Sequence, residues 1–122
     1  MPGYVDIHNH ILPGLDDGPR TINESIMLAR AMVAVGYDTV IATPHTFEGK
    51  PTPALISERL QELQHELNRQ SIPPNLLPGS EPHIEPGIIA QLEKGKLQTL
   101  NNTCYLFIEL PFFQPLPPTP AT

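Results

Sequence analysis

Two histidines close to the N-terminus, His8 and His10, have the residue type and the spacing of a metal site. β-favouring side chains surround them and Pro13-Gly14 follows, so the segment is predicted to be the end of a short strand. Side chains two positions apart in a strand point to the same side, so both imidazoles project together, with Asp6 behind them. Two imidazoles on a rigid backbone can supply half of a metal site. A His-x-His pair also occurs as ordinary surface or core histidines. Whether this pair binds a metal therefore depends on where the other potential ligands lie.

The elements that position these histidines are predicted from hydrophobic periodicity. Apolar side chains recur at helical spacing after Thr21 and after Thr52, and each of these threonines can cap a helix. Short apolar runs between the helices have the length of buried parallel strands. The expected order is strand (to residue 10), helix (21–36), strand (39–42), helix (from 52), strand (75–77), short helix (87–93) and strand (104–108). This alternation predicts an α/β fold with parallel strands and right-handed crossovers.

Each predicted strand is followed by a histidine or a carboxylate. The candidates, strand by strand, are His8 and His10 with Asp16 and Asp17, then His45, then Glu81 with His83, and finally Glu109. The carboxyl ends of parallel strands meet at one edge, where α/β active sites are built, so these groups are expected to lie together. Imidazoles and carboxylates without a thiolate cluster suit Mn²⁺, Zn²⁺ or Fe²⁺. Neighbouring cations roughly 3.5–4 Å apart would bind an oxyanion and activate water, which is the chemistry of phosphoester hydrolysis.

The composition is that of one small acidic domain. The chain has 122 residues, a formal charge of −6 and 39% hydrophobic residues, which is enough for a packed core. The acidic balance gives no reason to expect nucleic acid or an anionic membrane surface as a partner. No apolar run approaches the ~20 residues of a membrane helix, and no signal peptide is recognised, so a cytoplasmic location is expected. The single cysteine, Cys104, cannot form an internal disulfide and is predicted to be a core residue of the last strand.

The end of the chain is unusually rich in proline. The sequence contains 16 prolines, and several of them lie between residues 111 and 120. Proline excludes helix and disfavours strand, so residues 114–122 are expected to form a disordered tail after a domain of residues 1–113. The tail is interpreted either as a proline-rich docking segment or, preferably, as a truncated or altered chain end.

Five ordered segments carry a resemblance to a known family. They are DIHNHILPGLDDG (6–18), IATPH (41–45), LPGSE (77–81), LNNT (100–103) and FIELPF (107–112). Together they resemble the PHP (polymerase and histidinol phosphatase) family. More closely, they are similar to the bacterial manganese-dependent tyrosine-protein phosphatases of capsular and exopolysaccharide loci. The resemblance extends from residue 2 to about residue 113.

The resemblance implies the N-terminal half of a distorted (β/α)7 barrel with a site for two or three metal ions, Mn²⁺ or alternatively Zn²⁺ or Fe²⁺. It assigns metal ligands to His8, His10, Asp17, His45, Glu81 and Glu109, with Asp16 as the neighbouring alternative to Asp17. It implies that a metal-activated hydroxide attacks phosphotyrosine directly, on a bacterial tyrosine kinase that controls polysaccharide assembly. His83 is expected to be exposed and not a ligand, and Asp6 is expected to orient a histidine.

The later motifs of the family do not occur in this sequence. They are a His-Pro-Glu-Arg motif and a final Asp-x-His motif, which supply further ligands and a phosphate-binding arginine, whereas the last arginine here is Arg69. No catalytic acid or phosphate-binding arginine is therefore assigned, and the isolated chain is expected to be a weak or inactive phosphatase unless an oligomer or another chain completes it. Two alternatives remain open: a histidinol-phosphatase-like phosphoesterase, and a non-catalytic fragment or binding module.

Overall fold

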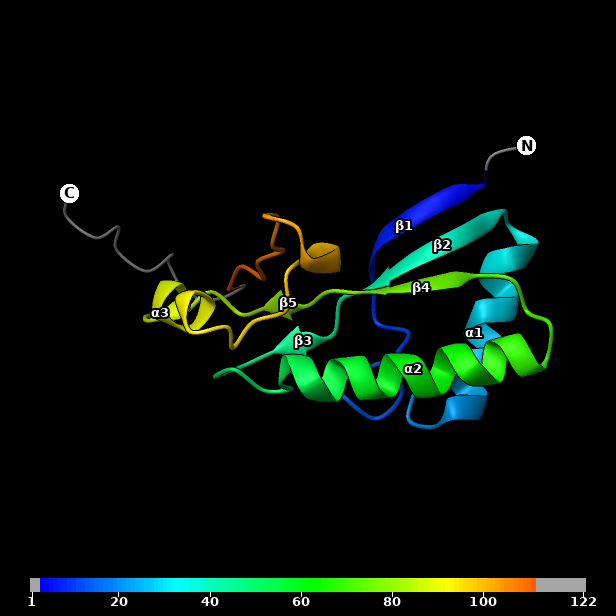
Figure 1. Ribbon diagram of the computed structural model, residues 1–122, viewed down its shortest axis with the longest axis horizontal. Coiled ribbons are helices and arrows are strands. Elements are labelled where there is room, and N and C mark those ends of the chain that lie inside the picture. Colours follow the sequence, from blue (N-terminus) through cyan, green and yellow to red (C-terminus); the bar gives the residue numbers. More distant parts are fainter. Residues whose placement is uncertain (1–2, 112–122) are drawn as a thin grey trace.

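The structure is a computed structural model, which describes residues 3–111. Its elements, in chain order, are β1 (Tyr4–Asn9), α1 (Ile22–Ala34), β2 (Tyr37–Ala42), β3 (His45–Thr46), α2 (Pro53–Arg69), β4 (Asn75–Pro78), β5 (Glu81–Pro82), α3 (Ile88–Glu93) and the 3-10 helix η1 (Leu100–Asn102) (Figure 1). Every strand pair in these elements is parallel, which confirms the predicted α/β fold. No helix within residues 3–111 is long and apolar enough to cross a membrane.

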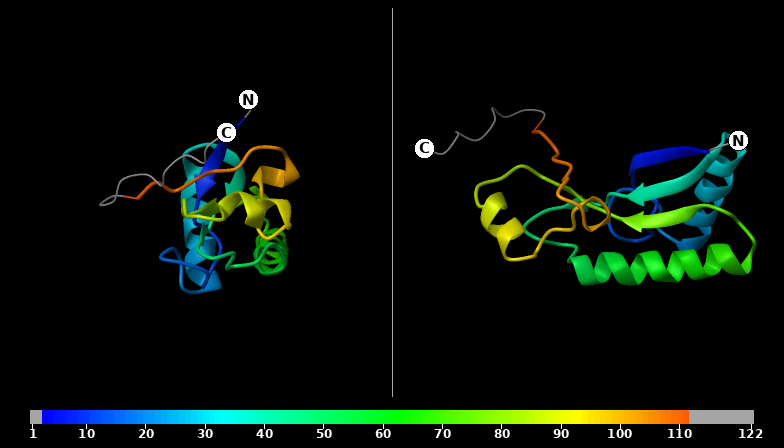
Figure 2. Two further views of the ribbon diagram at one scale, coloured as in Figure 1. Left: turned by 90° about the vertical axis from the view of Figure 1, so that its left-hand side faces the viewer. Right: turned by 45° about the horizontal axis from the view of Figure 1, so that its top comes forward.

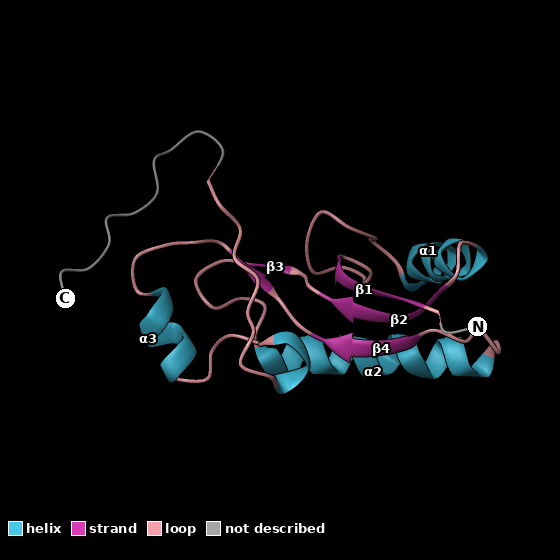
Figure 3. Cartoon of the chain, turned by 90° about the horizontal axis from the view of Figure 1, so that it is seen from above, coloured by secondary structure: helices cyan, strands magenta, loops and turns pink. Residues whose placement is uncertain are grey.

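The main sheet consists of β1, β2 and β4, with β2 in the centre. Helices α1 and α2 both lie against one face of it, as Figures 1 and 3 show. The core between the helices and the sheet is apolar and consists of Ile11, Leu12, Ile26, Ala29, Met32, Val40, Ala42, Ile56, Leu63, Leu67, Ile72 and Leu76. Because α1, α2, β2 and β4 all contribute to this core, packing fixes these two strands relative to the helices.

Both long helices begin where the sequence predicts. The hydroxyl of Thr21 accepts a hydrogen bond from the Glu24 amide at 3.2 Å, and Thr52 accepts one from the Leu55 amide at the same distance. The Glu24 carboxylate accepts the amide of Arg20, one residue before the cap, at 2.7 Å, an arrangement close to a capping box.

A second, two-stranded sheet continues the first one. Ala42 of β2 pairs with Pro78 of β4, and three residues later on each strand His45 of β3 pairs with Glu81 of β5. The register is therefore preserved across the break, and the second sheet lies beyond the C-terminal ends of β2 and β4 (Figure 1; Figure 2 gives two further views of the ribbon). Gly79 lies in the break, where a Cβ would approach the Ala42 carbonyl oxygen to 2.9 Å, so a side chain cannot be accommodated without movement.

The predicted strand over residues 104–108 is wrong. These residues are irregular, and the segment pairs only at its end, where Glu109 forms an isolated parallel bridge with His83. Tyr105 is 69% exposed, and Cys104 is exposed and not a core residue. The apolar side chains of this run do favour a strand, but a strand also needs a neighbour with which to pair along its length, and that cannot be read from propensity. The expected tail over 114–122 lies outside the described residues.

Candidate metal centre

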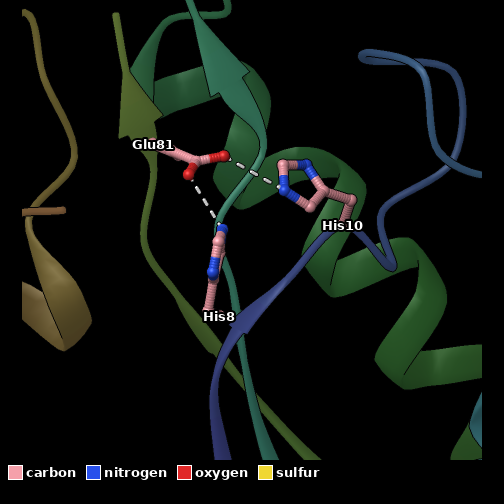
Figure 4. A group of neighbouring side chains, drawn as sticks. All are labelled: His8, His10 and Glu81. Carbon is pink, nitrogen blue, oxygen red and sulfur yellow. Dashed lines mark ion pairs between the residues drawn. The ribbon is translucent and has the colours of Figure 1, made fainter. Parts of the chain in front are cut away.

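The two histidines of the first motif converge on one carboxylate. His8 is in β1, His10 follows directly after it, and Glu81 begins β5. His8 Nε2 lies 2.9 Å from Glu81 Oε2, and His10 Nε2 lies 3.2 Å from Glu81 Oε1 (Figure 4). Each imidazole thus faces a different oxygen of the same carboxylate. The expectation that His8 and His10 project together is confirmed, since their ring centroids are 5.5 Å apart.

His45 adds a third imidazole to the same carboxylate. Its Nδ1 lies 3.2 Å from Glu81 Oε1 and 3.0 Å from Glu109 Oε2, and its Nε2 lies 3.5 Å from Asp17 Oδ1. The rings of His10 and His45 are 4.4 Å apart. The side-chain cluster therefore joins residues that are up to about one hundred positions apart in sequence, and all six predicted ligands are part of it.

Within the described residues, two overlapping groups in the cluster have ligand atoms that lie within 4.8 Å of one another. One contains His8, His10 and Glu81, and the other contains His10, Asp17 and His45. Three protein ligands leave coordination positions for water or substrate, as in catalytic sites, whereas structural zinc sites are closed by four. The donors are imidazoles and carboxylates, a set that fits Mn²⁺, Zn²⁺ or Fe²⁺.

The adjacent aspartates Asp16 and Asp17 differ in burial and in the contacts of their side chains. The side chain of Asp16 is only 5% exposed, whereas that of Asp17 is 79% exposed. Asp16 Oδ2 accepts the backbone amide of His45 at 2.9 Å and lies 2.7 Å from His10 Nδ1, and Asp16 Oδ1 accepts the Gly18 amide at 2.9 Å. Asp16 thereby fixes the loop and two histidines, while Asp17 remains free to face a cation.

Electrostatics fixes the proton on His10. Burial by itself raises the pKa of Asp16, but hydrogen bonds from His10 and from the amides of Gly18 and His45 outweigh burial and hold this pKa below its usual value. The same hydrogen bond with Asp16 raises the pKa of His10, against the opposing effect of burial. Asp16 is therefore ionised and only accepts, so His10 carries its proton on Nδ1. In the neutral imidazole, Nε2 then points its lone pair toward Glu81.

The neighbours of the cluster include residues that sequence reasoning missed. The ring of Phe107 lies 4.9 Å from that of His8, at 32°, and limits the positions that His8 can take. Phe107 belongs to the last of the five sequence segments, and this membership is the feature of the sequence that could have placed it near the cluster. Asp6 was expected to orient a histidine; it accepts the backbone amide of His8 at 3.0 Å and does not contact a ring. His83, expected to be exposed, is 31% exposed with Nδ1 3.9 Å from Glu109 Oε2.

A cavity of about 330 Å³ opens beside the cluster. Asp16, His45 and Glu109 form its polar wall. Phe47, Lys50 and His83 also line it, and the first two were not singled out from the sequence. The cluster therefore has an adjoining space of the size of a small-ligand pocket.

Comparison with known proteins decides the family. The family model described as "Capsular polysaccharide synthesis, CpsB/CapC" matches residues 4–116, which is nearly the whole chain. The chain belongs to the CpsB/CapC family. The resemblance drawn from the five segments is thereby confirmed.

Relatives in the CpsB/CapC family include named phosphatases. The chain is 44% identical over 110 residues to "Tyrosine-protein phosphatase YwqE" of Bacillus subtilis (strain 168), covering 88% of this chain and 43% of that protein. It is 34% identical over 109 residues to "Putative tyrosine-protein phosphatase CapC" of Staphylococcus aureus, again covering 88% of this chain and 43% of that protein. It therefore spans less than half the length of these curated relatives, their N-terminal part.

A solved structure shows the same fold. Its description is "Crystal structures of YwqE from Bacillus subtilis and CpsB from Streptococcus pneumoniae, unique metal-dependent tyrosine phosphatases". The TM-score is 0.85 at 42% sequence identity, over 89% of this chain and 45% of the solved chain. At this identity the arrangement of β1 to β5 is a property that the CpsB/CapC chain shares with its solved relative.

The role of Asp16 leads to a testable expectation. In Asp16→Asn, an NH₂ group replaces one of two oxygens that both accept N–H groups, so at least one contact is lost. We expect the affinity for Mn²⁺ to fall about 10- to 100-fold, the effect typical of groups that orient metal ligands. Titration calorimetry measures this, with Asp38→Asn, whose carboxylate bonds to the Gly3 amide away from the cluster, as the control. Equal affinities in the two variants would contradict the role given to Asp16.

Proposed function

We propose that this chain forms part of a metal-dependent phosphoesterase that acts on phosphotyrosine. The observation that carries the proposal is the position of Glu81, whose carboxylate lies within 3.2 Å of ring nitrogens from His8, His10 and His45. A carboxylate with two oxygens so placed is suited to bridge neighbouring cations. The proposed ligands are His8, His10, Asp17, His45, Glu81 and Glu109, and the proposed ions are Mn²⁺, or alternatively Zn²⁺ or Fe²⁺, two or three in a whole site.

Bound cations supply an activated water and neutralise phosphate charge. The residues of the chain provide position and electrostatics. Asp16 keeps the His10 proton on Nδ1 and ties the amide of His45 to the loop, so that two of the three imidazoles are held by one buried carboxylate. Glu109 is held by backbone hydrogen bonds to both neighbours of His83, since its amide donates to Pro82 and its carbonyl oxygen accepts from Ile84. The proposed ligands thus stand on fixed backbone, as a site with preorganised ligands requires.

The proposed substrate is a phosphotyrosine protein, specifically a bacterial tyrosine kinase that controls polysaccharide synthesis, in the cytoplasm. The names of the relatives and the description of the family support this choice.

We further propose that the 122-residue chain alone turns over substrate slowly. In the part of the chain that the structure describes, Arg30 bonds to Gln70 just after α2, and Arg59 and Arg69 pair with glutamates of α2. None of the described residues that line the cavity beside His45 is an arginine. Phosphoryl transfer depends strongly on cations that stabilise the transition state, so a site without an arginine is expected to be slow.

The experiment that tests the proposed function measures metal content and p-nitrophenyl phosphate hydrolysis on the same purified chain with added Mn²⁺. The proposal expects bound Mn²⁺ and a slow hydrolysis that His8→Ala abolishes and that Glu93→Gln, an exposed residue of α3, leaves unchanged. Turnover that persists in His8→Ala would show that the hydrolysis does not arise at this cluster. A wild-type chain that takes up no metal would favour the non-catalytic alternative.

A further inference from the structure

β3 is followed at once by a tight turn that carries an exposed aromatic ring and a lysine. The amide of Phe47 donates to the Lys50 carbonyl oxygen at 2.9 Å, and the Lys50 amide donates to the Phe47 carbonyl oxygen at 3.0 Å. Glu48 and Gly49 between them have φ values of 52° and 75°, the pattern of a type I′ turn. The Glu48 amide also donates to the Glu85 carboxylate at 3.1 Å. The turn is therefore fixed by hydrogen bonds at both of its ends and at its tip.

The turn is rigidly connected to the proposed ligands. Phe47 follows His45 by two residues, and the Thr46 carbonyl oxygen between them accepts the His83 amide at 2.8 Å. The rings of Phe47 and His83 lie 5.9 Å apart at 55°, which is within the range of favourable aromatic pairs. Phe47 and His83 thus form an aromatic wall beside the polar wall of His45 and Glu109, in one cavity of about 330 Å³.

The exposure of Phe47 is not explained by folding. Its side chain is not part of the core, and the residue is 58% exposed on a turn beside a polar cluster. Lys50, at the other end of the turn, is the cationic side chain among the described residues that line the cavity. An apolar ring, a cation and a set of potential metal ligands around one small cavity are complementary to a phosphate ester of a phenol. A phosphate ester of an aliphatic alcohol would leave the ring of Phe47 uncovered.

We infer that Phe47 and Lys50 form the wall that selects aryl phosphates over alkyl phosphates at this site. Phe47 contacts the aryl ring, and the Lys50 ammonium contacts the phosphate. The inference rests on the proposed function, because cations held by His45 and Glu109 would have to bind the phosphate for its aryl group to reach Phe47. It adds two specificity-determining residues that are not among the proposed metal ligands.

The test is equilibrium binding of two phosphonates that cannot be hydrolysed, phenylphosphonate and methylphosphonate, to the full 122-residue chain saturated with Mn²⁺. Titration calorimetry compares the wild type with Phe47→Ala, Phe47→Tyr and Lys50→Gln. Two matched controls are Tyr105→Ala, an exposed aromatic outside the cavity, and Lys96→Gln, an exposed lysine outside it. A separate Mn²⁺ titration of each variant reports on the metal site independently of phosphonate binding.

We expect the wild type to bind phenylphosphonate about tenfold more tightly than methylphosphonate, the preference that one aromatic contact provides. Phe47→Ala should lose this preference with unchanged Mn²⁺ affinity, and Phe47→Tyr should retain it because the ring remains. Lys50→Gln should weaken both phosphonates by a similar factor. Neither control variant should change the preference or the affinities.

Three results would overturn the inference. Phe47→Ala could keep the preference while binding Mn²⁺ normally, the wild type could bind both phosphonates equally, or it could bind Mn²⁺ and neither phosphonate. Each of these leaves the proposed metal site standing. A wild-type chain that takes up no Mn²⁺ would instead remove the proposed function and this inference together, so the two failures are distinguishable.

Discussion

Glu81→Gln is expected to weaken Mn²⁺ binding by roughly 100-fold or more, since loss of a ligand costs at least as much as loss of the group that orients one. The glutamine has the same shape but no charge, and its NH₂ group would face an imidazole nitrogen that now faces an oxygen. Because the Glu81 carboxylate contacts His8, His10 and His45, one substitution disturbs both groups of ligands. Titration calorimetry with Mn²⁺ on the purified variant measures the change.

A matched control for this variant is Glu93→Gln, which makes the same chemical change at an exposed position of α3. We expect its affinity for Mn²⁺ to equal that of the wild type. Because glutamine at residue 81 preserves volume, circular dichroism should show both variants folded. If Glu81→Gln bound Mn²⁺ as tightly as Glu93→Gln does, the cluster would not be the metal site.

Leu63→Ala is expected to lower the free energy of unfolding by about 2–5 kcal/mol. Leu63 is fully buried on the face of α2 that packs into the core, where a cavity would remain in place of its lost methyl groups. Urea denaturation followed by circular dichroism measures the loss as a lower midpoint with an unchanged slope. For a domain of marginal stability, this is a large fraction of the total.

The control in the same helix is His65→Ala. His65 is an exposed residue of α2 and is not part of the core. We expect its stability to stay within about 0.5 kcal/mol of the wild type and its Mn²⁺ affinity to be unchanged. A loss as large as that of Leu63→Ala would mean that α2 does not pack as the structure shows.

The sequence predicts which residues form the cluster because one rule of parallel sheets applies to most of them. The carboxyl ends of parallel strands share an edge, so His10, His45 and Glu81 could be expected to meet before any distance was known. The strand predicted before Glu109 is wrong, yet Glu109 still reaches His45, because its amide and its carbonyl oxygen bond to Pro82 and Ile84, on either side of His83. A single bridge is sufficient to place one side chain, and periodicity does not reveal single bridges.

The missed residues depend on contacts between distant segments. The side chain of Asp16 is buried and that of Asp17 is exposed because Asp16 is the one that accepts the His45 amide, 29 residues away. The sequence Asp-Asp-Gly does not indicate which of the two aspartates makes this contact. Phe107 and Phe47 look like core residues in sequence because both are apolar. Their positions beside His8 and His83 arise from how separate segments pack, and neither spacing nor composition carries that information.

The interval that separates the two sheets has equal length on both strands. Thr43-Pro44 lies between β2 and β3, and Gly79-Ser80 lies between β4 and β5. Because side chains alternate along a strand, an insertion or deletion of one residue in either interval would turn His45 or Glu81 to the opposite face and separate them. Substitutions that fit the space leave the register intact. In the evolution of this chain, substitutions in these intervals can therefore be tolerated at positions other than Gly79, whereas insertions and deletions are expected to be eliminated.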